Sequence, residues 1–126
     1  MKTILVVDDK ADIVELVKSR LEANHYKVIV ASDGNEGIKQ AKQHKPDLIV
    51  MDIMMPNMSG GEAVKVLKSD AGTQHIPVVF LTAVGSSVRE GEEPGRVYVD
   101  GQFFPAISKP FKPEKLLSEI KKLVGN

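Results

Sequence analysis

The feature that most constrains the fold of this chain is a set of short, uninterrupted apolar runs rich in β-branched residues. Four such runs stand out, at Ile4–Val7, Val28–Val30, Leu48–Met51 and Val78–Leu81. Their apolar side chains occupy successive positions rather than alternate ones, so a strand built from each must be covered on both faces. The runs therefore predict buried strands with a layer of structure on either side.

Between these runs, apolar residues recur at helical spacing. They are Ile13, Leu16, Val17 and Leu21, then Ile38 and Ala41, then Val64 and Leu67, and finally Leu116, Leu117, Ile120, Leu123 and Val124. Helix-start signals precede three of the stretches, at Ser32-Asp33, Ser59 and Pro113-Glu114. Strands that alternate with helices indicate βαβ units, and right-handed crossovers place helices on both faces. We therefore predict an α/β fold with a doubly wound parallel sheet.

One stretch departs from this rhythm. A helix is expected after Thr82, but residues 85–95 contain Gly and Pro at several positions in their second half. The next ten residues, 96–105, hold two β-prone triplets joined by Asp100-Gly101, a strong signal for a tight hairpin turn. We predict a loop plus β-hairpin in place of the fourth helix, with an irregular surface loop as the alternative.

Composition excludes several classes of function. The 126 residues contain no Cys, which rules out disulfides, zinc–thiolate sites, iron–sulfur clusters and a Cys nucleophile. The 17 basic residues balance 17 acidic ones, and aromatic residues make up only 5%, so neither phosphate-backbone binding nor base stacking is favoured. The N-terminal run Ile4–Val7 is far shorter than a membrane span or a signal-peptide core. We expect one cytoplasmic domain over residues 1–126, without direct contact to nucleic acid or membrane.

Polar residues that could carry chemistry follow the predicted strands. In chain order they are Asp8, Asp9, Asp52, Thr82 and Lys109. Lys109 follows Ala106–Ser108, which we take as a short fifth strand. In a doubly wound sheet, function gathers at the carboxyl ends of the strands. We therefore expect these five side chains to converge on one edge of the sheet.

Three carboxylates that converge need a counterion. At ~4 Å and an effective dielectric of about 20, each like-charged pair costs about 4 kcal/mol. A divalent cation removes this cost, and an all-oxygen set of Asp8, Asp9 and Asp52 suits Mg²⁺, which also tends to share a phosphate. Lys109 and Thr82 could each hold a phosphoryl oxygen. Asp52, in reach of metal and lysine, could be the nucleophile that forms an aspartyl phosphate.

Each residue also has a plainer explanation when taken alone. An Asp after a strand often caps a helix or stabilises a turn, which applies to Asp8 and Asp9. Lys109 could be a solvated surface residue, and Thr82 a simple turn residue. Their occurrence together, in this order at successive strand ends, favours a shared site.

These residues resemble the receiver domain of two-component response regulators, of the stand-alone chemotaxis-regulator type. The matching segments are Leu5–Asp9, Asp52–Gly60, Phe80–Ala83 and Lys109–Phe111, and the resemblance extends over essentially the whole chain. The resemblance implies a flavodoxin-like five-stranded sheet in the order 2-1-3-4-5. It also implies a signalling switch that catalyses only its own phosphorylation and dephosphorylation.

The resemblance further implies a role for each matched position. Asp9 and Asp52 are expected to ligate Mg²⁺ directly together with the backbone carbonyl of Met54, and Asp8 to act through water. Asp52 is expected to take the phosphoryl group from a sensor histidine kinase. Lys109 is expected to pair with that group, and the hydroxyl of Thr82 to move toward it.

Two departures from the family pattern concern the readout. Ala106 stands where family members usually carry an aromatic switch residue, and the fourth helix looks replaced. We hypothesise that the loop and hairpin after Thr82 form the surface that an unknown downstream protein reads, so that deletion of residues 96–104 would abolish partner binding.

Three alternative functions remain at this stage. An aspartate-nucleophile phosphatase of the haloacid dehalogenase type would also use Asp and Mg²⁺, but it usually needs a second Asp where Met54 stands. A flavodoxin-type binder would cradle an anion after the first strand, where Asp8 and Asp9 would repel it. A degenerate receiver would serve only as an interaction module.

Overall fold

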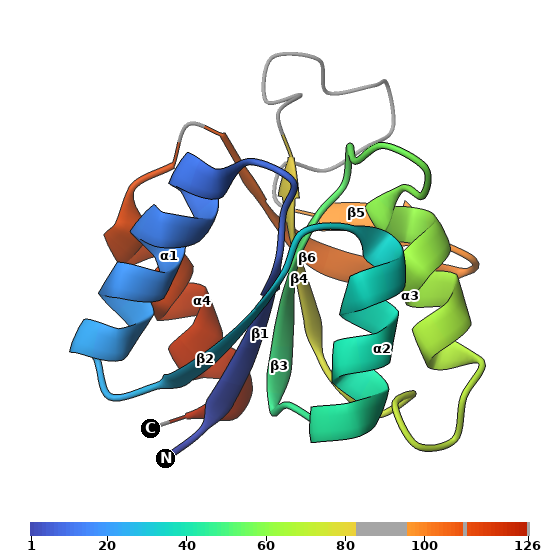
Figure 1. Ribbon diagram of the computed structural model, residues 1–126, viewed down its shortest axis with the longest axis horizontal. Helices are drawn as coiled ribbons and strands as arrows, with labels where there is room; N and C mark the ends of the chain where they lie inside the picture. Colours follow the sequence, from blue (N-terminus) through green and yellow to red (C-terminus); the bar gives the residue numbers. More distant parts are fainter. Residues whose placement is uncertain (83–95, 110, 126) are drawn as a thin grey trace.

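The computed structural model describes residues 1–82, 96–109 and 111–125, without the side chain of Thr82. Strands and helices alternate from the N-terminus to the fourth strand, and a hairpin and a final helix follow (Figure 1). In order they are β1 (Thr3–Val7), α1 (Ala11–Ala23), β2 (Lys27–Ala31), α2 (Gly34–His44), β3 (Leu48–Asp52), α3 (Gly60–Lys68), β4 (Val78–Thr82), β5 (Arg96–Val99), β6 (Gln102–Ser108) and α4 (Pro113–Val124). Within the described ranges, no helix is long and apolar enough to cross a membrane.

The strands form one sheet in the order β2-β1-β3-β4-β6-β5. The first five strands across the sheet run parallel, and β5 pairs antiparallel with β6 at the edge. With β6 counted as the fifth parallel strand, this confirms the predicted doubly wound topology. The additional strand β5 belongs to the predicted hairpin.

Helices cover both faces of the sheet, as the continuous apolar runs predicted. Figure 1 shows α1 and α4 on one side and α2 and α3 on the other. Successive residues of β1 feed the two cores in turn: Leu5 and Val7 pack on the α2 and α3 side, and Ile4 and Val6 on the α1 and α4 side. All four side chains are fully buried.

The expected helix starts are confirmed. The side chain of Asp33 accepts a hydrogen bond from the backbone N–H of Glu36 at the start of α2. Ser59 and Glu62 form a reciprocal capping box on α3. Pro113 occupies the first turn of α4, where its missing N–H costs nothing.

The predicted hairpin is confirmed, but its second arm is longer than expected. Asp100 and Gly101 both have positive φ, at 49° and 86°, as a type I′ turn requires. The second arm and the expected fifth strand form one continuous strand, β6. This strand pairs with β5 up to Pro105 and with β4 from Ala106 onward. Pro105 therefore lies at the change of partner, where its lack of a backbone N–H is tolerated.

The hairpin covers sheet surface beside α3 (Figure 1). The ring of Phe104 packs edge-on against Phe80 of β4, with 5.7 Å between ring centroids. Val97 and Val99 are half-buried against the same core. This hairpin is the one that the sequence predicted between β4 and the last parallel strand. The prediction about residues 85–95 lies outside the described residues.

Candidate phosphoacceptor site

The acidic residues after β1 and β3 lie side by side at the carboxyl edge of the sheet. β1 and β3 are parallel neighbours, and Val7 lies opposite Met51 in their register. The next residues, Asp8 and Asp52, therefore project from the same edge. Each is only 1% exposed, which is unusual for Asp and demands compensation by neighbouring groups.

Lys109 supplies most of that compensation. Its Nζ donates to Asp8 Oδ2 at 2.9 Å and to Asp52 Oδ1 at 3.2 Å. Lys109 directly follows β6, whose residues Ala106–Ser108 pair with β4, so the sheet carries it to this edge. The lysine joins two carboxylates that are 44 residues apart in the chain.

Asp9 and Lys10 complete the cluster on its exposed side. One oxygen each from Asp8, Asp9 and Asp52 lies within 4.8 Å of the others. The ammonium of Lys10 lies 3.3 Å from Asp9 Oδ1 and 3.7 Å from Asp52 Oδ2. The backbone N–H of Lys10 donates to Asp8 Oδ1 at 2.9 Å.

The carboxylates experience different electrostatic environments. Burial raises the pKa of Asp52, and the charge of Asp8 raises it further, against the opposing effect of Lys109. Burial also acts to raise the pKa of Asp9, but the hydrogen bond and charge of Lys10 outweigh it and hold that pKa below its ordinary value. Asp52 Oδ2 is buried and has no hydrogen-bond partner among the described residues. The site therefore holds one strongly buried carboxylate oxygen that is available for a ligand or a bond.

The profile of the "response regulator receiver domain" family matches residues 4–121 of the chain. The chain belongs to the receiver domain family. It is 35% identical over 125 residues to the polar-differentiation response regulator DivK of Brucella anthropi, and the match covers 99% of the chain and 98% of DivK. It is 40% identical over 121 residues to the phosphate regulon transcriptional regulatory protein PhoB of Klebsiella pneumoniae. That match covers 95% of the chain but 50% of PhoB, so the chain spans about half the length of this relative.

Solved receiver structures agree with this assignment. The chemotaxis protein CheY4 of Vibrio cholerae superimposes with a TM-score of 0.84 at 30% identity, with 98% of both chains covered. The receiver domain of the sensor histidine kinase PA1611 of Pseudomonas aeruginosa has the same fold, with a TM-score of 0.82 at 22% identity over 99% of this chain and 98% of that one. The PA1611 structure was solved with a magnesium ion coordinated in its active site cleft.

The receiver fold brings together four of the six residues predicted for the site: Asp8, Asp9, Asp52 and Lys109. Thr82 is the last residue of β4 and pairs through its backbone with Ser108, but its side chain lies outside the described structure. Met54 lies two residues beyond Asp52, and its side chain is largely exposed.

Lys10 was not among the residues predicted for the site. The only available signal was its position directly after the acidic pair Asp8-Asp9, which does not fix where the ammonium group points. Of the plainer explanations for Asp8, the turn applies as well: its carboxylate accepts from the N–H of Lys10, two residues along the chain, whereas α1 has no side-chain cap.

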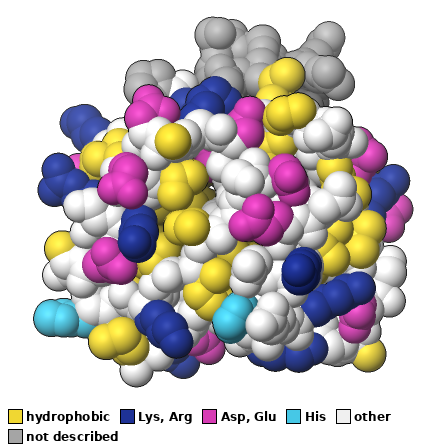
Figure 2. Space-filling view, viewed as in Figure 1, with side chains coloured by type: hydrophobic (Ala, Val, Ile, Leu, Met, Phe, Trp, Pro, Cys, Tyr) yellow, Lys and Arg dark blue, Asp and Glu magenta, His cyan; other side chains and the backbone are white. Residues whose placement is uncertain are grey.

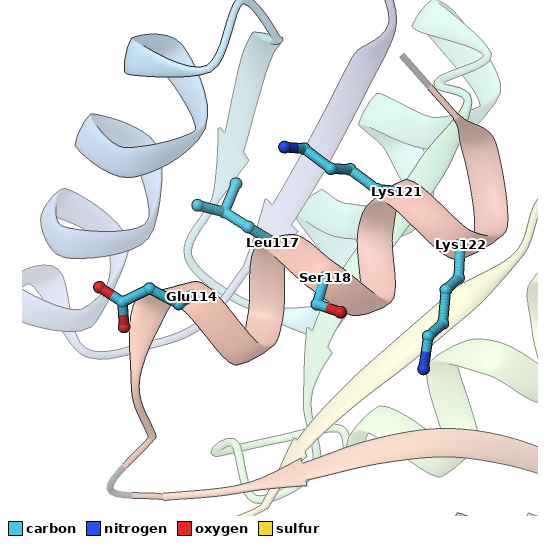
Figure 3. Close-up of a pocket in the computed structure, with 5 residues that line it drawn as sticks. All are labelled: Glu114, Leu117, Ser118, Lys121 and Lys122. Carbon is cyan, nitrogen blue, oxygen red and sulfur yellow. The ribbon is translucent and has the colours of Figure 1, made fainter.

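Hollows on the surface of the receiver domain add little to the site. A hollow of about 260 Å³ opens beside Asp8 and Asp9 between α1 and the end of β2. A larger one, of about 560 Å³, lies over α4, where Figure 3 shows the side chains of Leu117 and Lys121 among its lining.

Figure 2 shows acidic and basic side chains interspersed over the face it displays, in keeping with the formal net charge of +0.

Proposed function

We propose that this receiver domain is a phosphoacceptor switch in which Asp52 takes a phosphoryl group from a sensor histidine kinase in the presence of Mg²⁺. One observation carries the proposal. Asp52 is buried, one of its oxygens is held by Lys109, and the other has no hydrogen-bond partner in the described part of the chain. That second oxygen lies on the side of the cluster where Asp9 and Lys10 meet solvent.

The donor set fits a magnesium ion. Three carboxylates supply only oxygen atoms, which hard divalent cations prefer, and their oxygens lie within 4.8 Å of one another. Asp52 Oδ2 is buried and accepts no hydrogen bond from the described residues, which is a second, independent sign that a cationic group belongs here. Asp9, Asp52 and the backbone carbonyl of Met54 would hold the ion, and Asp8 would act through water. The ion, when bound, would supply positive charge to phosphoryl oxygens.

The chain's own residues account for the transfer step. One carboxylate oxygen of Asp52 attacks the phosphorus of a phosphohistidine while the other stays free to hold the cation. The new O–P bond forms as the N–P bond breaks, and the imidazole nitrogen keeps the electron pair and takes up a proton from solvent. Lys109 holds Asp52 in place before transfer and is positioned to pair with a phosphoryl oxygen afterward. Thr82 is assigned its hydroxyl role from the family motif alone.

We further propose that a partner protein reads the phosphorylated state at the hairpin. Tyr98 and Phe103 are exposed on its outer face and pack edge-on, with 5.1 Å between ring centroids, and the guanidinium of Arg96 lies 5.0 Å from the centroid of the Phe103 ring. Exposed aromatic and Arg side chains are common at the centres of protein interfaces. The deletion of residues 96–104 would also remove all of β5, the first three residues of β6 and the buried Phe104, so substitutions at Tyr98 and Phe103 are the better probe.

The phosphoacceptor proposal is tested by intact-protein mass spectrometry after incubation with acetyl phosphate and Mg²⁺. We expect one added phosphoryl group, which disappears in Asp52→Asn and when the divalent ion is chelated. Asp70→Asn, at a partly exposed Asp that pairs with Lys42, is the matched control and should label normally. Labelling that persists in Asp52→Asn would refute the assignment.

The same preparation separates the remaining alternatives. A phosphatase would turn over p-nitrophenyl phosphate continuously, whereas the proposed switch stops at one phosphoryl group per chain. A degenerate receiver would show neither labelling nor turnover. For the readout, amide NMR should show shifts over residues 96–104 on phosphorylation in the wild-type chain and none in Asp52→Asn.

A further inference from the structure

We infer that Lys10 is a built-in competitor of the divalent cation and sets how tightly the site binds it. This inference rests on the proposed Mg²⁺ site. It concerns a residue that the phosphoacceptor chemistry does not use, and it assigns that residue a control over metal affinity.

The contacts of Lys10 define the competition. Its ammonium lies 3.3 Å from Asp9 Oδ1 and 3.7 Å from Asp52 Oδ2, which come from the two carboxylates proposed as direct metal ligands. Asp52 Oδ1 is already engaged by Lys109, so Oδ2 is the oxygen left for another cation. Lysine and metal therefore seek the same oxygens.

The backbone holds Lys10 beside the site. Its N–H donates to Asp8 Oδ1 at 2.9 Å, and the residue is the N-cap of α1. The start of the side chain is therefore fixed at the edge of the acidic cluster, and only the side chain itself can move. A lysine tethered this way returns to the carboxylates whenever the metal leaves.

Exposure decides which of the two lysines gives way. The side chain of Lys10 is 49% exposed, whereas that of Lys109 is 10% exposed and bonded to two carboxylates. Two ammonium groups balance two of the three carboxylates, and a divalent ion would add positive charge directly beside Lys10. We expect Lys10 to swing into solvent when the ion binds, and Lys109 to stay.

The consequence is a lowered affinity for Mg²⁺ that depends on ionic strength. An exposed ion pair contributes at most about 1 kcal/mol, so loss of the competing lysine should tighten Mg²⁺ binding by about fivefold. The difference should shrink at high salt, because screening weakens the hold of Lys10 on the carboxylates.

The test is a Mg²⁺ titration of the full chain followed by amide NMR, at constant pH. The wild-type chain is compared with Lys10→Gln, with Lys10→Arg, which keeps the charge, and with Lys121→Gln. Lys121 is an exposed lysine on α4, and its substitution makes the same change in net charge away from the cluster. Dispersed amide spectra confirm that each variant is folded.

We expect Lys10→Gln to bind Mg²⁺ about fivefold more tightly than wild type, while Lys121→Gln and Lys10→Arg stay within about twofold of it. Saturation in Lys10→Gln alone would also support the inference. Saturable wild-type binding that Lys10→Gln leaves unchanged or weakens overturns the inference and leaves the phosphoacceptor proposal standing. No saturable binding in any of the chains overturns both.

Discussion

Lys109 donates to one carboxylate oxygen of Asp52 at 3.2 Å, and no described residue gives a hydrogen bond to the other oxygen. Lys109 thus stabilises the buried carboxylate of Asp52 through one oxygen and leaves the other oxygen without a hydrogen bond. Because the side chain of Lys109 is only 10% exposed, water has little access to take over its hydrogen bond to the carboxylate. Stability and chemistry at this edge of the sheet consequently depend on the same side chain.

Lys109→Met should lower the free energy of unfolding by about 3 kcal/mol at neutral pH, because it leaves two buried carboxylates without their shared cation. Urea denaturation measures the change. Lys112→Met removes an exposed lysine three residues along the chain, at the start of α4, and should cost less than about 0.5 kcal/mol. Equal losses of unfolding free energy in the two variants would show that the contacts of Lys109 with Asp8 and Asp52 do not stabilise the fold.

Asp52→Asn should stabilise the fold at neutral pH by on the order of 1 kcal/mol. Burial, and then the charge of Asp8, raise the pKa of Asp52 above its ordinary value of 3.8, so the native state binds that proton more tightly than the unfolded state. Stability from this group is therefore lost as pH rises from about 3.8 through the raised pKa. The advantage of the variant should grow as pH rises through the raised pKa of Asp52 and vanish below pH 3.8. Thermal melts across this range measure it.

Asp70→Asn serves as a control of opposite sign. The backbone N–H of Gly72 lowers the pKa of Asp70, and the charge of Lys42 adds to the effect. Its contribution to stability is therefore present above the ordinary pKa of 3.8 and is lost as pH falls through the lowered value. The variant should be less stable than wild type at pH 7 and approach it in acid. If both variants changed in the same direction with pH, the electrostatic argument would fail.

The parallel sheet and the helices were predictable because their signals are local. Apolar runs such as Ile4–Val7 are buried on both faces wherever they occur in a chain of this kind, and Asp100-Gly101 dictates a tight turn. The continuity of β6 was not predictable, since Pro105 reads as a strand end. Only the tertiary arrangement, in which β6 changes partner at that residue, makes a proline acceptable there.

The candidate site shows the same division. Asp8, Asp52 and Lys109 could be placed together from the sequence because parallel strands end at a common edge. Lys10 could not, because its contribution depends on the direction of a flexible side chain, and an exposed lysine next to an Asp looks like any solvated residue. Position in the fold follows from the pattern, whereas side-chain direction follows from the packed structure.

Gly60→Ala should slow phosphorylation of Asp52 about tenfold or more. A Cβ at Gly60 would collide with the backbone oxygen of Asp52 and crowd the Cα of Ile53, so the start of α3 and the end of β3 would have to separate. Small displacements of a reacting group cost large factors in rate. The rate of labelling by acetyl phosphate measures the effect.

Gly61→Ala is the matched control for that change. The nearest atoms to a Cβ there are 3.9 Å away, on Ser59 and Val99, which is ordinary contact. Gly61 lies within α3, so Ala should stabilise the chain by about 0.5–1 kcal/mol and leave the labelling rate unchanged. A similar loss of rate in both variants would point to a general effect of helix α3 rather than to contact with Asp52.

Phe104→Ala should destabilise the chain by about 3 kcal/mol, whereas Phe103→Ala should cost about 1 kcal/mol or less. Phe104 is 5% exposed, packs edge-on against Phe80 and lies under the ammonium of Lys68, so its loss leaves a cavity where the hairpin meets the sheet. Phe103 is 54% exposed and loses only its contacts with Tyr98 and Arg96. Urea denaturation of the two variants compares adjacent residues of identical chemistry. Similar losses would mean that the hairpin does not seal this side of the core.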